Sequence, residues 1–293
     1  MNPPLLTPEF VAKLEQLELI SRKIFTGRMK GERRSKRKGT SVEFADHRNY
    51  VVGDDLRFID WNILIRLDRL FIKLYEEEED LHFHLLLDTS LSMDFGDPKK
   101  LLFAKRVAAA LAYIGLFNLD RVMVWPFSDD LLPGMPAARG RKSLWRVVEF
   151  LESVPIAGGS DFGQSCKNFS IKHGGKGVVV VLSDLLDKRG FEAGLRYLLA
   201  RQMDIYVIHI LAEEEVRPEL AGDLRLVDVE DRDVAEITVS APLLARYKAN
   251  VNAYCAAVKE FCVRRGITYL FTTNQVSFER LVLTYLRERG LVR

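Results

Sequence analysis

The sequence predicts a doubly wound α/β domain, built on a mainly parallel sheet and preceded by an N-terminal extension. From residue 81 onwards, short strands of nearly uniform apolar character alternate with segments of helical periodicity. Strands that are apolar on both faces are typical of parallel sheets covered by helices on both sides. Right-handed crossovers between successive strands then give the doubly wound arrangement. The chain has 293 residues, of which 48% are hydrophobic and 29% charged, so it can bury such a core without disulfides.

The first 80 residues do not show this alternation of apolar strands and helices. Thr7-Pro8-Glu9 predicts a helix start, because Thr caps helices and Pro is tolerated in the first turn. Apolar residues at helical spacing continue this helix to about Phe25, and a basic run at residues 28–38 follows. Residues 42–74 mix aromatic and charged side chains, with a strand-like alternation near their end. We therefore divide the chain into an N-terminal region, residues 1–80, and an α/β domain, residues 81–293.

Within the α/β domain, the hydrophobic pattern predicts five strands, six helices and one small hairpin. The strands are expected at residues 81–87, 121–127, 177–182, 205–210 and 268–271. The helices are expected at residues 100–117, 142–153, 162–173, 191–201, 243–265 and 278–289. The hairpin is expected to pair residues 224–229 with 236–239.

Three segments at strand ends or helix starts carry clusters of oxygen ligands. They are Asp88-Thr89-Ser90-Leu91-Ser92, Gly158-Gly159-Ser160-Asp161 and Ser183-Asp184. In a doubly wound fold, ligands bind outside the carboxyl ends of the strands, where the strand order reverses. We therefore expect these segments to meet there.

The residue types in these segments predict a divalent-cation site. In a loop that turns off a strand, Asp88, Ser90 and Ser92 can point the same way. Hydroxyl and carboxylate oxygens are hard ligands that suit Mg²⁺ or Mn²⁺ in near-octahedral geometry. Taken alone, the first segment is more typical of turn and capping residues than of a metal site, and only the three segments together favour a metal site.

This arrangement resembles the metal-ion-dependent adhesion site of von Willebrand factor A domains. That site combines an Asp-x-Ser-x-Ser motif, a Thr from a second loop and an Asp from a third. The resemblance implies that the metal ligands are Asp88, Ser90, Ser92, Ser160 and Asp184, with Ser160 in place of the usual Thr. It also implies that an acidic side chain of a protein partner completes the metal shell.

The stretch before the α/β domain resembles a more specific family. It contains Gly39-Thr40-Ser41-Val42-Glu43-Phe44, Arg48-Asn49-Tyr50 and the block Gly53-Asp54-Asp55-Leu56-Arg57-Phe58-Ile59-Asp60-Trp61. These strings are similar to the signature of bacterial, uncharacterised von Willebrand factor A-like proteins that accompany MoxR-type AAA+ ATPases. The resemblance implies a chaperone-like role, in which the metal-site protein and the ATPase mature or assemble client complexes. The arginines and aspartates of the stretch are interpreted as an ion-pair network that braces it on the α/β domain, with a surface for the ATPase or client as the alternative.

Several other function classes are disfavoured. The basic run at residues 28–38 lacks interleaved aromatic residues for base stacking, so nucleic-acid binding is not expected. Three cysteines without a Cys-x-x-Cys pair fit a reducing compartment. No signal sequence and no apolar run of about 18 residues is visible, so we expect a cytoplasmic protein of the soluble branch of this family.

The sequence favours a binding module over an enzyme. It contains neither a glycine-rich phosphate loop nor a nucleophile grouped with a histidine. Two alternatives stay open. The first is a metal-dependent phosphoester hydrolase, because Mg²⁺ with open coordination positions activates water. The second is an interaction protein with a vestigial metal site.

Overall fold

The computed structural model describes residues 4–15, 17, 42–77, 81–156, 158–173, 175, 177–201, 203–220, 222–229, 233–288 and 291–292. The chain divides into two compact units, one of Met1–Ile24 with Leu81–Arg293 and one of Phe25–Asp80. The basic run at residues 28–38, the end of the first predicted helix and the Gly39-Thr40-Ser41 string lie outside the described residues.

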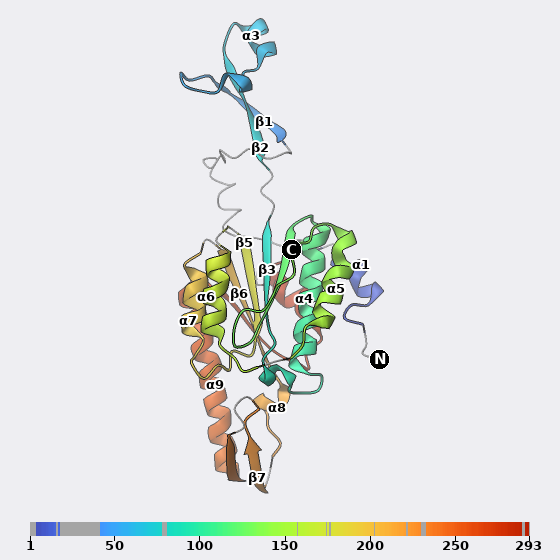
Figure 1. Cartoon of the computed structure of the whole chain (residues 1–293), viewed down its shortest axis with the longest axis vertical. Helices are drawn as coiled ribbons and strands as arrows, with labels where there is room; N and C mark the ends of the chain where they lie inside the picture. The colour runs from blue at the N-terminus through green and yellow to red at the C-terminus, as the bar shows by residue number, and fades with distance from the viewer. Residues whose placement is uncertain are drawn as a thin grey trace. The chain divides into compact units, whose positions relative to one another are not determined.

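The larger unit contains a five-stranded sheet in the order β4-β3-β5-β6-β9, and all its neighbouring strands run parallel. The predicted doubly wound α/β fold with a parallel sheet is thereby confirmed (Figure 1). The strands are β3 (His82–Asp88), β4 (Arg121–Phe127), β5 (Gly177–Ser183), β6 (Met203–Leu211) and β9 (Thr268–Thr273). They match the predicted strands and extend several of them by one to three residues.

Helices cover both faces of this sheet, because alternate strand residues point to opposite sides. On one face, residues such as Leu85 and Val180 form a core with α4 (Lys100–Phe117) and α5 (Leu144–Ser153). On the other, Leu86 and Val181 pack with α6 (Phe162–Lys172), α7 (Glu192–Leu199) and α9 (Ala241–Arg264). The continuous Val run of β5 is buried along its whole length, which is why its sequence shows no polar alternation.

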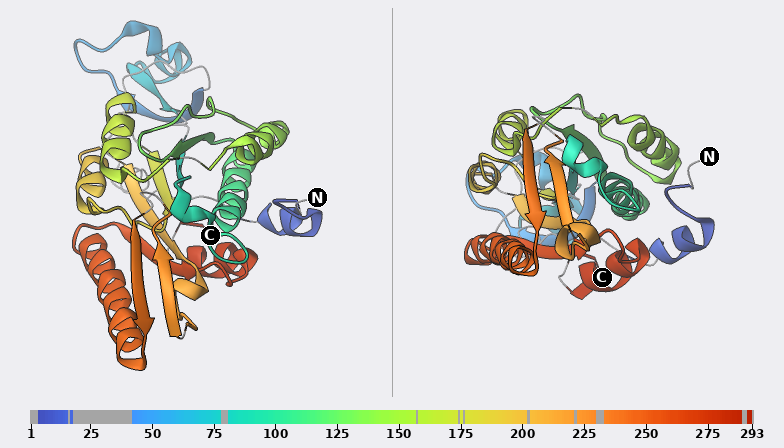
Figure 2. Two further views of the ribbon diagram at one scale, coloured as in Figure 1. Left: turned by 60° about the horizontal axis from the view of Figure 1, so that its bottom comes forward. Right: turned by 90° about the horizontal axis from the view of Figure 1, so that it is seen from below.

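The first helix belongs to this larger unit. Helix α1 (Pro8–Leu14) begins after the predicted cap Thr7, whose side chain accepts a hydrogen bond from the amide of Phe10. Leu14 is fully buried and the ring of Phe10 packs edge-on against that of Phe278, 5.1 Å away. Figure 2 shows α1 beside the C-terminal helical turns α10 (Phe278–Arg280), η4 (Leu281–Tyr285) and α11 (Leu286–Glu288). The described residues of α1 therefore group with the domain that starts at residue 81, whereas our division placed them in the N-terminal region.

The predicted hairpin is present as β7 (Gly222–Val227) and β8 (Val234–Val239), with shifted ends. It follows α8 (Glu213–Val216), and Figure 2 shows it running beside the N-terminal half of α9. The connecting 3-10 turns are η2 (Leu91–Asp94) and η3 (Arg141–Ser143), so the helix expected from residue 142 begins as a 3-10 turn. Among the described helices, none has the length and apolar character that crossing a bilayer requires.

The smaller unit is an antiparallel pair, β1 (Val42–Asn49) and β2 (Phe71–Glu77), with η1 (Leu56–Phe58) and α3 (Trp61–Leu67) between them. Its charged residues form ion pairs inside the unit. Arg48 binds Asp54 through two hydrogen bonds of 2.6 Å, and Asp60 caps α3 while pairing with His47 at 2.9 Å. These contacts lower the pKa of Asp54 and of Asp60 to about 2. The largest cause is the hydrogen bond from Arg48 for Asp54 and the hydrogen bond with His47 for Asp60. Ion pairs of the predicted kind are thus present inside the unit, while a role in bracing it on the α/β domain stays a prediction.

Candidate metal centre

The first predicted segment forms a tight turn at the carboxyl end of β3. Asp88 is the last residue of the strand, and its side chain is buried. Its oxygen Oδ1 accepts hydrogen bonds from the amide of Ser90 at 3.0 Å and from the Ser90 hydroxyl at 2.7 Å. The hydroxyl oxygens of Ser90 and Ser92 lie 3.0 Å apart. An Asp at a strand end folds the chain back in this way because its carboxylate accepts from backbone two residues on.

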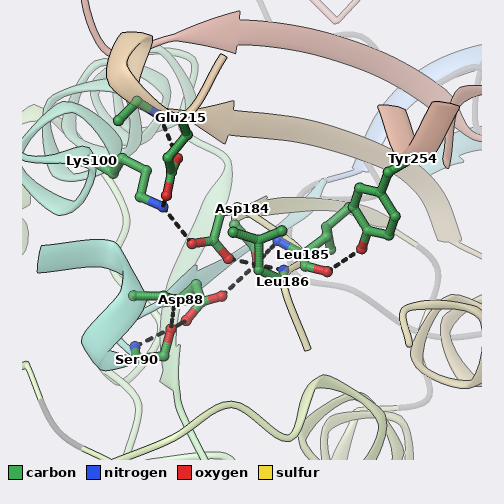
Figure 3. Close-up of polar contacts among 11 residues, drawn as sticks. Asp88, Ser90, Lys100, Asp184, Leu185, Leu186, Glu215 and Tyr254 are labelled. Atoms are coloured by element: carbon green, nitrogen blue, oxygen red, sulfur yellow. Dashed lines mark hydrogen bonds and ion pairs between the residues drawn. The ribbon is translucent and has the colours of Figure 1, made fainter. Parts of the chain in front are cut away.

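The third segment ends the neighbouring strand, and it meets the first. The hydroxyl of Ser183 donates to Oδ2 of Asp88 at 2.5 Å, and it accepts from the amide of Leu185 at 2.8 Å. Asp184 follows, buried, and its Oδ1 accepts from the amide of Leu186 at 3.1 Å. Figure 3 shows the side chains of Asp88 and Asp184 side by side. The connections after β3 and β5 leave toward opposite edges of the sheet, so this is the reversal point of the strand order.

The backbone after Asp184 is held in an uncommon conformation. Leu185 has a φ of 56°, a left-handed value that disfavours residues with a bulky side chain. Its side chain is buried, and its carbonyl oxygen accepts a short hydrogen bond from the hydroxyl of Tyr254 on α9 (Figure 3). Together with the Ser183 contact, these interactions fix the turn that positions Asp184. Strained backbone of this kind is concentrated at functional sites.

The second segment lies at the same end of the sheet, tied to the turns around it. The carbonyl oxygen of Gly158 accepts from the amide of Leu91 at 3.2 Å, and the amide of Gly159 donates to Asp129 at 3.1 Å. Gly158 has a φ of 74°, and a Cβ there would lie 2.4 Å from the Asp129 carboxylate, so the position requires glycine. Ser160, half-buried, follows these anchors, just before the α6 cap Asp161. The structure thus links the loop of Ser160 to the first segment through Leu91, while direct contact with a cation stays a prediction.

Two charged residues that the sequence did not reveal, Lys100 and Glu215, form a chain of ion pairs with Asp184. The ammonium nitrogen of Lys100, at the start of α4, is 2.7 Å from Asp184 Oδ2 and 2.6 Å from Glu215 Oε1 of α8. Lys100 is fully buried (Figure 3). A lysine preceding an apolar helix reads as a surface residue, so nothing local in the sequence marks it. The sequence places Ser183 next to Asp184, but nothing in it predicts the contact of Ser183 with Asp88.

The electrostatics of the centre favour a cation. Burial, and secondly the charge of Asp184, raise the pKa of Asp88 well above its usual range, although hydrogen bonds from Ser183 and Ser90 oppose the shift. Two carboxylates that stand close together in a buried site are stabilised by any positive charge placed between them. Perturbed carboxyl groups of this kind are typical of functional sites.

The donor set fits a small divalent ion. Mg²⁺ has metal–oxygen distances of 2.0–2.1 Å in octahedral geometry, which puts neighbouring ligand oxygens roughly 3.0 Å apart. The separation of the Ser90 and Ser92 hydroxyls is also 3.0 Å. Because Ser90 donates its hydrogen to Asp88, its oxygen accepts from the Ser92 hydroxyl and keeps one lone pair for a cation. Among the described residues, no group of three or more His, Cys, Asp and Glu side chains is arranged to hold a metal, so a cation here depends on the serine hydroxyls.

Known proteins resemble this chain over most of its length. The chain is 25% identical to an uncharacterized protein of Mycobacterium tuberculosis over 241 residues, which cover 80% of this chain and 76% of that protein. Among solved structures, it is similar to the conserved hypothetical protein BatB from Bacteroides thetaiotaomicron, with 15% identity and a TM-score of 0.44. That match covers 71% of this chain and 98% of BatB. An aerotolerance-related membrane protein from Bacteroides fragilis matches with 17% identity, a TM-score of 0.45 and the same coverage.

A protein-family model also matches more than half of the chain. Residues 46–257 match a family described as protein of unknown function DUF58, and they include the block at residues 53–61 together with all five predicted metal ligands. The family resemblance expected from that block is confirmed, and the chain belongs to the DUF58 family.

Proposed function

We propose that this protein is a binding module for other proteins that depends on a divalent cation, Mg²⁺ or Mn²⁺. We further propose that it acts with a MoxR-type AAA+ ATPase in the maturation or assembly of client protein complexes. The observation that carries the proposal is the 3.0 Å separation of the Ser90 and Ser92 hydroxyls beside the buried carboxylate of Asp88. The support for the ATPase partner is the family resemblance of residues 39–61, which lie largely in the smaller unit.

In this proposal the protein side chains do three things. Ser90, Ser92 and Ser160 present hydroxyl oxygens. Asp88 orients the Ser90 hydroxyl by accepting its hydrogen, and Asp184 supplies the second negative charge. When bound, the cation would supply a positive centre for an acidic side chain of the partner. The site lies at the reversal point of the sheet, where partners reach it from the loop side.

The test of cation binding is calorimetric titration of the metal-free protein with Mg²⁺ and Mn²⁺. The wild type should bind, and Asp88→Asn, which keeps the side-chain volume and removes the charge, should give no measurable heat. Asp223→Asn is the matched control, because Asp223 is exposed on the hairpin and accepts only from Thr238 at 2.6 Å in its described surroundings. This control should bind like the wild type. Absence of heat and of thermal stabilisation with the wild type at millimolar metal would favour a vestigial site.

The role of Ser160 needs its own variants. Ser160→Ala removes the hydroxyl and should weaken Mg²⁺ binding roughly tenfold, by analogy with other losses of metal-site support. Ser160→Thr keeps the hydroxyl and restricts its rotation, so its affinity should equal or exceed that of the wild type. Equal affinities for the alanine variant and the wild type would remove Ser160 from the ligand set.

The partnership is tested with a purified MoxR-type AAA+ ATPase. The purified ATPase should bind the immobilised wild-type protein in Mg²⁺, and EDTA or Asp88→Asn should abolish this binding. Binding to the ATPase that is unchanged by both treatments would contradict the metal dependence. Absence of binding under all conditions would refute the partnership and leave the cation proposal standing.

A further inference from the structure

The proposed metal ligand Asp184 already has a positive partner inside the protein. Lys100 is fully buried, and its ammonium bridges Asp184 Oδ2, at 2.7 Å, and Glu215 Oε1, at 2.6 Å (Figure 3). The contact with two carboxylates at these distances stabilises the charged form of the lysine.

A buried ion pair of this kind is costly to form, so its position is informative. Desolvating an ammonium group costs several kcal/mol, and good geometry with two carboxylates is needed to offset this. The three residues come from separate elements, α4, the loop after β5 and α8. Lys99, the neighbouring residue, pairs instead at the surface with Asp94 and is 58% exposed. The fold therefore buries Lys100, and not its neighbour Lys99, against Asp184 of the proposed site.

We propose that Lys100 is an internal cation that competes with the divalent ion for Asp184 and so sets the metal affinity of the site. The inference rests on the proposed function, in that it requires a cation to bind near Asp184. An ammonium group in hydrogen-bond contact with Asp184 repels a second cation placed beside the same carboxylate, and the repulsion is strong because the site is buried. The same contact stabilises the metal-free protein, since Asp184 is never left as an unpaired buried charge.

Glu215 limits this competition. It binds the ammonium group from the side of α8, and its carboxylate also accepts from the amide of Ala212 at 2.7 Å. Part of the lysine charge is therefore compensated away from Asp184. Without Glu215, the ammonium group would interact with Asp184 alone and would oppose the metal more strongly. The two residues should thus act on metal affinity in opposite directions.

The experiment is calorimetric titration of the full chain with Mg²⁺ and with Mn²⁺. Lys100→Met keeps the length of the side chain and removes its charge, and its affinity should rise roughly tenfold or more. Glu215→Gln should lower the affinity several-fold. Lys99→Met is the matched control for a lysine at the adjacent position, and its affinity should stay close to that of the wild type.

Loss of the lysine leaves the buried Asp184 and the half-buried Glu215 without their positive partner, so the metal-free single variant should have a lower Tm. Saturating Mg²⁺ should raise the Tm of this variant by more than it raises that of the wild type. The double variant Lys100→Met/Glu215→Gln removes one charge of each sign and is the version to titrate if the single variant does not fold. Its affinity should still exceed that of the wild type, because the competing ammonium group is gone.

The outcomes separate this inference from the proposal on which it rests. If the wild type binds the metal and Lys100→Met binds it with equal or lower affinity, the competition is overturned and the cation site stands. Weakening by both Lys100→Met and Glu215→Gln shows that the ion pair only maintains the structure, and also overturns it. Absence of heat with the wild type, Lys100→Met and the double variant overturns the cation site itself.

Discussion

The hydroxyl of Ser183 lies 2.5 Å from the carboxylate oxygen Oδ2 of Asp88, and this hydrogen bond joins the carboxyl ends of two adjacent parallel strands. Because the other oxygen of Asp88 accepts from Ser90, the carboxylate is held at both ends by hydroxyl groups from different loops. The aspartate therefore organises the centre, as a fixed acceptor around which Ser90, Ser92 and Ser183 are arranged.

Removal of the Ser183 hydroxyl should affect both stability and cation binding. Ser183→Ala leaves one oxygen of a buried carboxylate without its donor, which costs about 1–3 kcal/mol of unfolding free energy. Denaturant unfolding measures this cost, and titration with Mg²⁺ should show weaker binding. Ser170→Ala is the control, since Ser170 is also a buried serine and donates to the Tyr197 carbonyl at 3.0 Å. That variant should lose stability without losing metal affinity, and equal affinity in both variants would contradict the organising role.

Neutralising Asp88 should make the metal-free protein more stable. Burial and the neighbouring charge of Asp184 raise the pKa of Asp88, so its ionised form is unfavourable in the folded protein. Asp88→Asn removes that charge and should raise the unfolding free energy by roughly 1–2 kcal/mol in EDTA. Asp187→Asn tests whether any buried aspartate gives this result, because Asp187 accepts from the amides of Phe162 and Arg189. It should be neutral or destabilising, and a loss of stability in Asp88→Asn would contradict the electrostatic argument.

The buried imidazole of His84 should make stability fall in mild acid. Burial first, then the charges of His173 and His82, lower its pKa to about 3, and its Nδ1 accepts from the Trp125 indole at 3.2 Å. The folded-state pKa is thus below the unfolded value of about 6.5, so the unfolded chain takes up the proton first. The contribution of His84 to the free energy of unfolding is therefore fully present above pH 6.5. It is lost as the pH falls toward 3, by up to about 1.4 kcal/mol per pH unit.

The variant His84→Gln isolates this contribution, because its amide oxygen can still accept from Trp125. Between pH 7 and pH 5, its unfolding free energy should fall by about 1–2 kcal/mol less than that of the wild type. Denaturant titrations at the two pH values give the difference directly. Parallel pH profiles would mean that His84 does not resist protonation in the folded state.

Helix α1 should contribute to the stability of the larger unit. Leu14 is fully buried with residues of α4, and the Tyr113 hydroxyl of α4 donates to Glu15 at 2.8 Å. Leu14→Ala should cost about 2–4 kcal/mol, through lost burial and a residual cavity. Lys13→Ala, at an exposed position of the same helix, should be nearly neutral. Similar small effects from both variants, measured by thermal unfolding, would show that α1 does not dock as described.

Local patterns in the sequence were sufficient for the sheet and for part of the site. Each buried strand is a short apolar run bounded by polar residues, and these limits place Asp88 and Asp184 at carboxyl ends, where parallel strands gather their loops. The helix cap at Thr7 and the hairpin of β7 and β8 were predicted for the same reason, since their signals lie within a few residues. The pairing of β1 with β2 and the helix α3 were missed, because aromatic and charged residues at those positions show no single period.

Only the tertiary structure decided which distant residues share the centre with Asp88 and Asp184. Lys100 is separated from Asp184 by 84 residues and from Glu215 by 115, and each looks like an ordinary surface residue in its own segment. Their meeting depends on the register of β3 against β5 and on the direction of the crossovers that bring α4 and α8 to the same end of the sheet. The sequence by itself determined that carboxylates and hydroxyls would gather at the reversal point, because strand ends are local features. That a buried lysine would lie among them was decided by packing, because a charge is buried only where folding supplies its partners.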